Sequence, residues 1–276
     1  RVLEVLDTPV ELFETEPHFS FLPKDAPHVE FDHVTFRYAR GSFAVRNIDF
    51  ALKRGETLGI IGATGAGKST IVRLLMRYYD VSEGSVKIDG VDIRDYATSD
   101  LRAKFGVVFQ NDTLFKDTIR ENIRLGRNLT DEQLLEAARR AQALEFIEEQ
   151  GGLDAPVAIK GANLSGGQKQ RLLLARALAG DPDILLLDDS SSALDYKTDS
   201  KLREEIRLHC ADATKIIIAQ RISSVQDADR ILVLDNGKID GLGTHEELLK
   251  TNAIYQEVYS SQTQGSGDFD KQGGEQ

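Results

Sequence analysis

Several residue types are scarce in this sequence, and each scarcity excludes a class of protein. Cys210 is the single cysteine among 276 residues, so no internal disulfide can form and a reducing compartment is the natural setting. The longest apolar runs, such as 184–187 and 216–219, have the length of a strand rather than the roughly 18 residues of a membrane-spanning helix, so we expect the chain as it stands to be soluble. Residues 1–6 are too short, and too closely followed by acidic residues, to be a signal peptide.

Basic residues are also in deficit. The chain has 34 lysines and arginines against 45 aspartates and glutamates, which gives a formal net charge of −11. A general nucleic-acid binder needs clustered basic side chains to neutralise phosphates, so this balance argues against one. A site for a small nucleotide remains compatible with it, because such a site depends on local charge. With 41% hydrophobic residues, the chain can bury an ample core.

The two ends of the chain differ in composition from the rest. Residues 1–27 contain four of the six prolines, which favour an extended path, so we interpret this stretch as a lead-in to a folded domain over 28–260. Residues 1–6 themselves resemble the last turn of a helix. Residues 261–276 are mostly glycine, glutamine, serine and acidic residues, a composition that predicts a disordered tail.

Between these ends, strand-like and helix-like segments alternate, with Gly55 as a turn between the second and third strands. We expect strands at 29–38, 44–50, 57–62, 184–187, 215–219 and 230–234. We expect amphipathic helices at 68–78, 130–150 and 166–179. This alternation predicts an α/β fold with a mainly parallel sheet and helices on both of its faces.

Residues 62–70 match the phosphate-loop pattern G-x-x-x-x-G-K-[ST], and they lie between an expected strand and an expected helix. Glycines in such a loop let backbone N–H groups converge on phosphate oxygens, while the following helix points its positive end at the same place. The side chain of Lys68 should reach the β- and γ-phosphates of ATP, and the Ser69 hydroxyl should bind Mg²⁺. The residues expected to hold the nucleotide here are Thr64, Gly65, Ala66, Gly67, Lys68, Ser69 and Thr70.

A carboxylate for the same metal ion follows the apolar strand 184–187. Asp188 stands at the carboxyl end of that strand, where a parallel sheet places its binding residues. Alone, an acid after four aliphatic residues would more often be a plain strand end. Together with the phosphate loop, it predicts that Asp188 and Ser69 share the Mg²⁺ ion.

Residues 164–168, Leu-Ser-Gly-Gly-Gln, carry the most specific pattern. Ser165 can cap a helix, and Gly166 and Gly167 would leave the start of that helix bare for a phosphate. With Gln168 and the Lys-Gln-Arg that follows, the stretch resembles the signature motif of ABC transporters. Over about 29–259 the chain resembles the nucleotide-binding domain of that family.

The resemblance implies a P-loop NTPase core, an antiparallel β subdomain at the N-terminal side, and a helical subdomain at about 112–180 that carries the signature. It also implies that 1–27 is a linker from a transmembrane domain. In this family two such domains enclose two ATP molecules, and each site joins the phosphate loop of one domain to the signature of the other. The segments 114–123 and 243–248 look like those of the exporter subclass.

Further site residues follow from the resemblance, position by position. Tyr38 matches the aromatic residue that stacks on adenine, with Val45 beside it. Gln110 matches the glutamine that touches Mg²⁺ and faces the membrane domain. Residues 192–195 match the D-loop, which ends in Asp195. The contacts with ATP expected from the signature are those of Leu164, Ser165, Gly166, Gly167 and Gln168.

Three positions depart from the family pattern. Active members have a glutamate after the metal-binding aspartate, whereas this chain has Asp189, whose carboxylate is one methylene shorter. A misplacement of roughly 1 Å can cost 10²-fold in rate. The switch histidine is replaced by Gln220, which cannot carry a proton's charge. Ile159 stands where exporters usually have a glutamate in the stretch that faces the coupling helices.

These departures resemble the degenerate-site subunit of a heterodimeric exporter at the cytoplasmic face of a membrane. Its partners would be a transmembrane domain and a second nucleotide-binding domain with an intact glutamate and histidine. One alternative is an active homodimeric exporter ATPase that tolerates Asp189 and Gln220. Another is an ABC ATPase of repair or translation, which should show a coiled-coil insertion or a basic surface, and neither is visible in the sequence.

Overall fold

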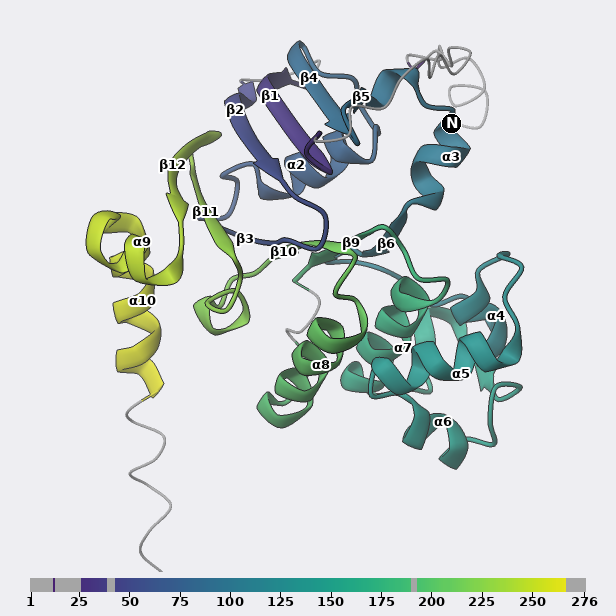
Figure 1. The fold of residues 1–276 in the computed structure, drawn as a ribbon. Coiled ribbons are helices and arrows are strands. Elements are labelled where there is room, and N and C mark those ends of the chain that lie inside the picture. The colour runs from purple at the N-terminus through teal and green to yellow at the C-terminus, as the bar shows by residue number, and fades with distance from the viewer. Residues whose placement is uncertain (1–11, 13–25, 39–42, 190–192, 267–276) are drawn as a thin grey trace, which may run out of the picture.

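The structure is a computed structural model that describes residues 12, 26–38, 43–189 and 193–266. The helix end expected at 1–6 and most of the lead-in to residue 27 lie outside this range. Two main sheets, a short two-stranded sheet and a group of helices make up the described part (Figure 1). The α/β class, the mainly parallel sheet and the antiparallel sheet at the N-terminal side are all confirmed.

The antiparallel sheet has the strand order β2-β1-β4-β5. Its strands are β1 (Val29–Arg37), β2 (Phe43–Leu52), β4 (Glu83–Ile88) and β5 (Val91–Asp92). Phe31 of β1 lies opposite Phe50 of β2, and the two rings stack with their centroids 4.7 Å apart. Both side chains are buried, so one face of this sheet covers the core.

The larger sheet has the order β12-β11-β3-β10-β9-β6. Its strands are β3 (Thr57–Ile61), β6 (Phe105–Val108), β9 (Ile184–Asp188), β10 (Thr214–Ile218), β11 (Arg230–Asp235) and β12 (Lys238–Gly243). All neighbours pair in parallel except β11 and β12. The inner strands β3, β9 and β10 are apolar over most of their length, as is usual for a parallel sheet covered on both faces. Because β11, β3, β10, β9 and β6 run parallel to one another, their carboxyl ends meet at one edge of the sheet.

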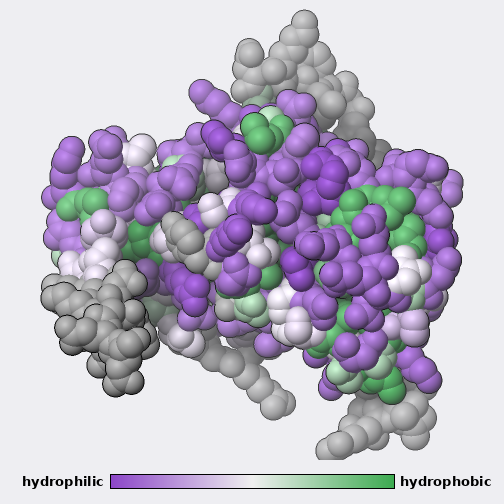
Figure 2. All heavy atoms as spheres, turned by 90° about the horizontal axis from the view of Figure 1, so that it is seen from below, coloured by the Kyte–Doolittle hydropathy of each residue, from purple (hydrophilic) through white to green (hydrophobic). Residues whose placement is uncertain are grey.

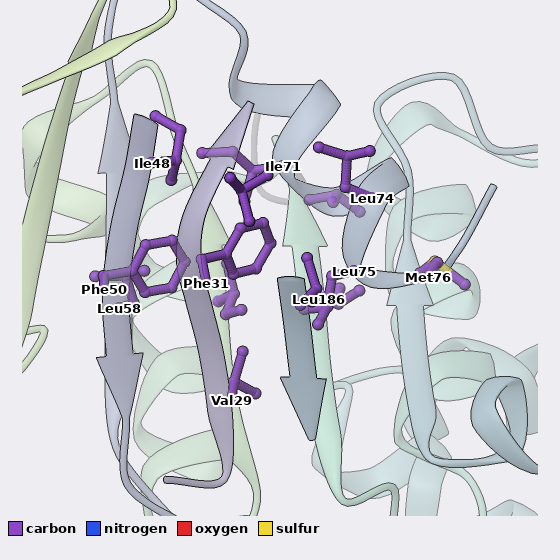
Figure 3. Close-up of a cluster of buried hydrophobic side chains, with 14 of the residues drawn as sticks. Val29, Phe31, Ile48, Phe50, Leu58, Ile71, Leu74, Leu75, Met76 and Leu186 are labelled. Atoms are coloured by element: carbon purple, nitrogen blue, oxygen red, sulfur yellow. The ribbon is translucent and has the colours of Figure 1, made fainter. Parts of the chain in front are cut away.

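Helix α2 (Lys68–Leu75) lies between the two sheets and fills the main core. Ile71, Leu74 and Leu75 of this helix belong to the same buried cluster as Phe31 and Ile48, and all five are labelled in Figure 3. Leu58 of β3 and Leu186 of β9 complete the same cluster from the other sheet. The helix is thereby locked against the strand that precedes the phosphate loop, which fixes the position of the loop itself.

A helical part follows β6 and packs around α7 (Gly166–Leu178). It contains α4 (Ile119–Arg124), α5 (Asp131–Arg140) and α6 (Leu144–Glu149), with the short pair β7 (Asp117–Thr118) and β8 (Pro156–Val157). The single helix expected over 130–150 is in fact two helices. The chain leaves the helical conformation at Gln142, whose φ of 56° ends α5 before α6 begins.

The remaining helices are α3 (Thr98–Ala103), α8 (Tyr196–His209), α9 (His245–Thr251) and α10 (Ala253–Ser266), and short 3₁₀ turns lie at Ile93–Asp95, Ile159–Gly161 and Ile222–Ser224. Helix α10 extends into the segment expected to be a disordered tail, because Tyr255, Val258 and Tyr259 pack against a buried cluster beside β11. Residues 267–276 lie outside the described range.

The surface agrees with the acidic, polar composition. The face in Figure 2 is largely hydrophilic, with apolar residues in scattered groups. Within the described ranges, none of the helices combines the length and the apolar character that a membrane crossing needs.

Candidate functional site

The loop between β3 and α2 has the backbone that the glycine pattern predicts. Gly62, Gly65 and Gly67 have φ angles of 154°, 83° and 106°, values that residues other than glycine rarely adopt. A Cβ atom at Gly62 would lie 2.2 Å from the Leu234 carbonyl oxygen, and one at Gly67 would lie 2.7 Å from the Ala44 carbonyl oxygen. Gly65 has open space around it, so only its φ requires glycine. The loop is thus held close to the backbone at Leu234 and Ala44, and its residues 63–65 are exposed.

Lys68 folds back over this loop. Its ammonium group donates to the carbonyl oxygens of Gly62, at 2.7 Å, and Ala63, at 2.9 Å. Partial burial lowers the pKa of Lys68, while the negative charges of Asp188 and Asp189 act in the opposite direction. A phosphate group would offer this half-buried cation a charged partner in place of neutral carbonyls.

Ser69 and Asp188 are brought together by the sheet although they lie far apart in sequence. The Ser69 hydroxyl donates to the Asp188 carboxylate across 3.1 Å. Burial raises the pKa of Asp188, and the hydrogen bond from Ser69 opposes that rise. A hydroxyl and a carboxylate are the hard oxygen ligands that Mg²⁺ takes from proteins, and its other positions go to water and phosphate. Among the described residues, no group of three or more His, Cys, Asp or Glu side chains is arranged to hold a metal ion.

Tyr38, just beyond the end of β1, lies beside α2. Its hydroxyl accepts a hydrogen bond from the Arg73 guanidinium at 3.2 Å and lies 3.4 Å from the Thr70 hydroxyl. Edge-to-face contacts with Phe36 and Tyr79, with centroids 4.8 and 5.2 Å away, fix the ring. The bond from Arg73 also raises the pKa of that guanidinium. The sequence analysis missed Arg73, although its spacing of three residues from Thr70 places both on one helix face.

Val45 has no exposed surface and packs beneath the loop, against Gly67. Val45 therefore supports the phosphate loop as a buried packing residue. Gln110 is exposed two residues after β6, whose Val108 pairs with Leu187 of β9. Gln110 therefore comes after the carboxyl end of β6, at the same edge of the sheet as Asp188. Its contact with Mg²⁺ stays a prediction.

Asp189 and Gln220, the two departures near the metal carboxylate, lie next to each other. The Gln220 amide donates to Oδ2 of Asp189 across 3.2 Å. The parallel register of β9 with β10, which pairs Asp188 with Ile218, sets this proximity. Asp189 has a φ of 53°, and its backbone N–H donates to the Ile218 carbonyl oxygen at 2.9 Å. Burial raises the pKa of Asp189, against the opposing charges of Arg221 and Lys68.

The start of α7 has the cap predicted from its sequence. The Ser165 hydroxyl accepts from the Gln168 N–H at 3.2 Å, and the Gln168 side chain accepts from the Ser165 N–H at 2.9 Å. The side-chain oxygen of Gln168 therefore accepts a hydrogen bond within the helix cap. Gly166 is exposed, and a Cβ there would meet only Ala193, at 3.7 Å.

The capped end of α7 is separate from the phosphate loop of the same chain. Helix α7 packs on α4, α5 and β6, whereas α2 packs on β2 (Figure 1). Leu164 is buried before the cap, and Gly167 lies near Ala193 and Leu194. Asp195 caps α8 by accepting from the Thr198 N–H, and the hydrogen bonds from Thr198 lower the pKa of Asp195. Ser192, the first residue of the expected D-loop, lies outside the described range.

The sequence pattern that defines ABC transporters matches residues 45–192. The chain belongs to the ABC transporter family. This ABC domain is 42% identical over 237 residues to a protein of Staphylococcus aureus strain NCTC 8325 / PS 47, provisionally named a multidrug export ATP-binding/permease protein. A protein of the same description from the bovine strain RF122 / ET3-1 is 41% identical over the same length.

The matches cover 85% of this chain and 41% of each of those proteins, so the ABC domain spans about two fifths of their length. Among solved structures, a bacterial Atm1-family ABC exporter with ATP bound superposes with a TM-score of 0.88 and 39% identity. That match covers 95% of this chain and 46% of the other. The similarity to the exporter type that the sequence suggested is confirmed.

Proposed function

We propose that this chain is the ATP-binding motor domain of an ABC exporter and that its own site hydrolyses ATP slowly or not at all. The loop over 62–70 holds the phosphates with Lys68, Tyr38 stacks on adenine, and Ser69 and Asp188 hold Mg²⁺. The bound ion would supply positive charge that offsets the charge of the phosphates. The glycine cradle and the adjoining hydroxyl and carboxylate support this assignment.

The observation that supports a slow site is the hydrogen bond between Gln220 and Asp189. A glutamate at position 189 would place its carboxylate one methylene further out, toward an attacking water. Asp189 instead accepts a bond from a neutral amide, and the Gln220 amide cannot carry a proton's charge. A well-placed general base contributes about 10²–10⁴-fold in rate, so its loss would dominate turnover.

The exposed start of α7, in the helical part, is the reason for proposing a second domain with a complete site. Ser165 and Gly166 are exposed, and the start of α7 offers backbone N–H groups and a helix dipole to an anion. That anion would be the γ-phosphate of ATP held by a partner domain with an intact glutamate and histidine. The relatives are named as ATP-binding/permease proteins, which favours transmembrane partner segments and a position at the cytoplasmic face of a membrane.

The test is ATP turnover by the chain alone and with a partner domain. We expect the purified chain to bind Mg-ATP in calorimetry and to hydrolyse it very slowly. Asp189→Glu with Gln220→His should raise turnover only where a second domain supplies its signature. Turnover by the unaltered chain as fast as that of a glutamate- and histidine-containing relative would instead support an active homodimeric ATPase.

A further inference from the structure

The turn after β10, residues 219–225, contains Gln220 and is held by a side chain from the far end of the chain. The Gln262 amide nitrogen donates to the Gln220 carbonyl oxygen at 2.8 Å. The Gln262 amide oxygen accepts from the Ile222 N–H at 2.9 Å. Both polar atoms of one amide thus bind the backbone on either side of Arg221, from a residue that the sequence analysis placed in a disordered tail.

Helix α10 is anchored so that Gln262 is held in place. Tyr255 of this helix has no exposed surface and belongs to the same buried cluster as Ile222 and Val225 of the 219–225 turn. Val258 and Tyr259 pack against that cluster one turn before Gln262. These buried contacts therefore fix the backbone of Gln262 beside the turn, so that only its side-chain rotamers remain to be ordered when the bonds to the turn form.

Gln220 is consequently held at two points. Its backbone carbonyl accepts from Gln262, and its side-chain amide donates to Asp189 at 3.2 Å. Arg203 of α8 also donates to the Ser223 carbonyl oxygen in the same turn. A turn fixed at several backbone atoms presents its side chains in one direction, whereas an untied turn would sample several.

We infer that Gln262 is a positioning residue for Gln220, so that the C-terminal helix sets the Asp189–Gln220 pair beside the phosphate site. This inference rests on the proposed function in that Gln220 stands in place of the switch histidine, and we take the Asp189–Gln220 pair to face the γ-phosphate of ATP bound to this chain. A glutamine suits the role because it offers one donor and one acceptor without charge. A glutamate could accept from Ile222 but could not donate to the Gln220 carbonyl, and an alanine could do neither.

The first experiment uses the full chain and compares Mg-ATP with Mg-ADP affinity by calorimetry. Loss of a hydrogen bond of ordinary strength corresponds to roughly three- to tenfold in an equilibrium, and we expect Gln262→Ala to reduce the preference for ATP over ADP by that factor. Gln262→Glu should do the same while keeping the side-chain volume. Gln256→Ala is the matched control, because the Gln256 amide donates to Leu249 from the same helix.

A double-mutant cycle separates positioning from a general structural role. In a Gln220→Ala background, Gln262→Ala should leave the preference for ATP unchanged, since the group that it positions is gone. An equal loss in both backgrounds, or an equal loss with Gln256→Ala, would overturn the inference.

Hydrogen exchange gives a readout that does not depend on nucleotide. Gln262→Ala should speed amide exchange at Ile222 relative to strands β3 and β9, because the Ile222 N–H loses its acceptor. Unchanged protection of the Ile222 amide from exchange in Gln262→Ala would contradict the positioning role of Gln262, even if the chain binds ATP. Absence of ATP binding by the unaltered chain would instead contradict the proposed function, and exchange would still decide the role of Gln262.

Discussion

Glycines occur in both the phosphate loop and the start of α7, but for different reasons. In the loop, a Cβ at Gly62 or Gly67 would fall 2.2–2.7 Å from a backbone carbonyl oxygen, so the fold itself requires glycine. At the start of α7, a Cβ at Gly166 or Gly167 would meet its nearest neighbour at 3.5–3.7 Å, which is ordinary contact. The fold has no need of glycine there. Under the proposed function, glycine at these two positions leaves room for a ligand that is bound to a partner domain.

The two regions also differ in how complete they are. The start of α7 has both halves of its capping box and follows the family pattern throughout. The phosphate site has its loop, its lysine and its metal carboxylate, but its last pair is Asp189 with Gln220. If the proposed function holds, this domain contributes more to the chemistry of its partner's site than to that of its own.

The largest expected effect tests this division in an assembled transporter. Gly166→Glu places a negative side chain where the partner's γ-phosphate would lie, and loss of one such stabilising contact costs roughly 10²–10³-fold in rate. Asp189→Ala should change steady-state hydrolysis little, because the proposed function assigns this residue to a slow site. Measurement of both variants at saturating ATP checks the asymmetry. Comparable damage from the two changes would mean that both sites work alike.

The next effect concerns stability and needs only the isolated chain. Gly62→Ala combines a clash with a backbone carbonyl and a φ of 154° that alanine resists, so it should lower the free energy of unfolding by about 2–5 kcal/mol. Gly166→Ala should leave it unchanged or raise it by up to about 1 kcal/mol, since alanine is the better helix former. Urea unfolding monitored by circular dichroism measures both. Equal destabilisation would remove the distinction between the two sets of glycines.

A smaller effect concerns the base end of the site. Stacking on a base is worth about 1–3 kcal/mol, so Tyr38→Ala should weaken ATP binding by roughly ten- to a hundredfold. Phe115→Ala, at an aromatic residue of the helical part that is 56% exposed, is the control and should leave the affinity unaltered. Calorimetry measures the ATP affinity of both variants and tests whether Tyr38 contacts the base. Equal affinities for Tyr38→Ala and the unaltered chain would take Tyr38 out of the site.

The smallest effect is a contrast in pH dependence between the phosphate site, with Asp188, and helix α5 of the helical part, with Glu136. Burial raises the pKa of Asp188, so its contribution favours folding at low pH and is lost as the pH rises through the folded-state value. Hydrogen bonds from Arg139 and Arg140 lower the pKa of Glu136 from 4.5 to about 2, so its contribution is present at neutral pH and is lost as the pH falls toward 2. Glu136 is 40% exposed, which limits its share to about 1 kcal/mol or less.

Substitutions convert this contrast into a measurement of unfolding free energy at pH 7 and pH 4. Asp188→Asn should stabilise the chain more at pH 7 than at pH 4, because the amide removes a buried charge. Glu136→Gln should destabilise it more at pH 7 than at pH 4, because the arginines lose their charged partner. The same pH trend for both variants would contradict the assigned environments.

The sequence by itself determined the features that depend on a few neighbouring residues. The glycines of 62–67, the Ser165–Gln168 capping box and the apolar runs of β3, β9 and β10 are all local patterns, because dihedral limits, caps and strand periodicity act within one turn or strand. The two-residue turns Asn236-Gly237 and Asp89-Gly90, with positive φ throughout, carry an equally local hairpin signal that the sequence analysis overlooked.

Only the tertiary structure decided which distant residues meet. Gln220 bonds Asp189 and Gln262 binds the turn around Ile222, and each pairing joins separate elements, whereas the meeting of Ser69 with Asp188 was expected from their motifs. These contacts depend on strand order, in which β3 lies between β11 and β10 rather than beside its neighbours in sequence. That order results from helices packing across the sheet, and the apolar faces that drive such packing are too alike for a single sequence to specify the partner of each.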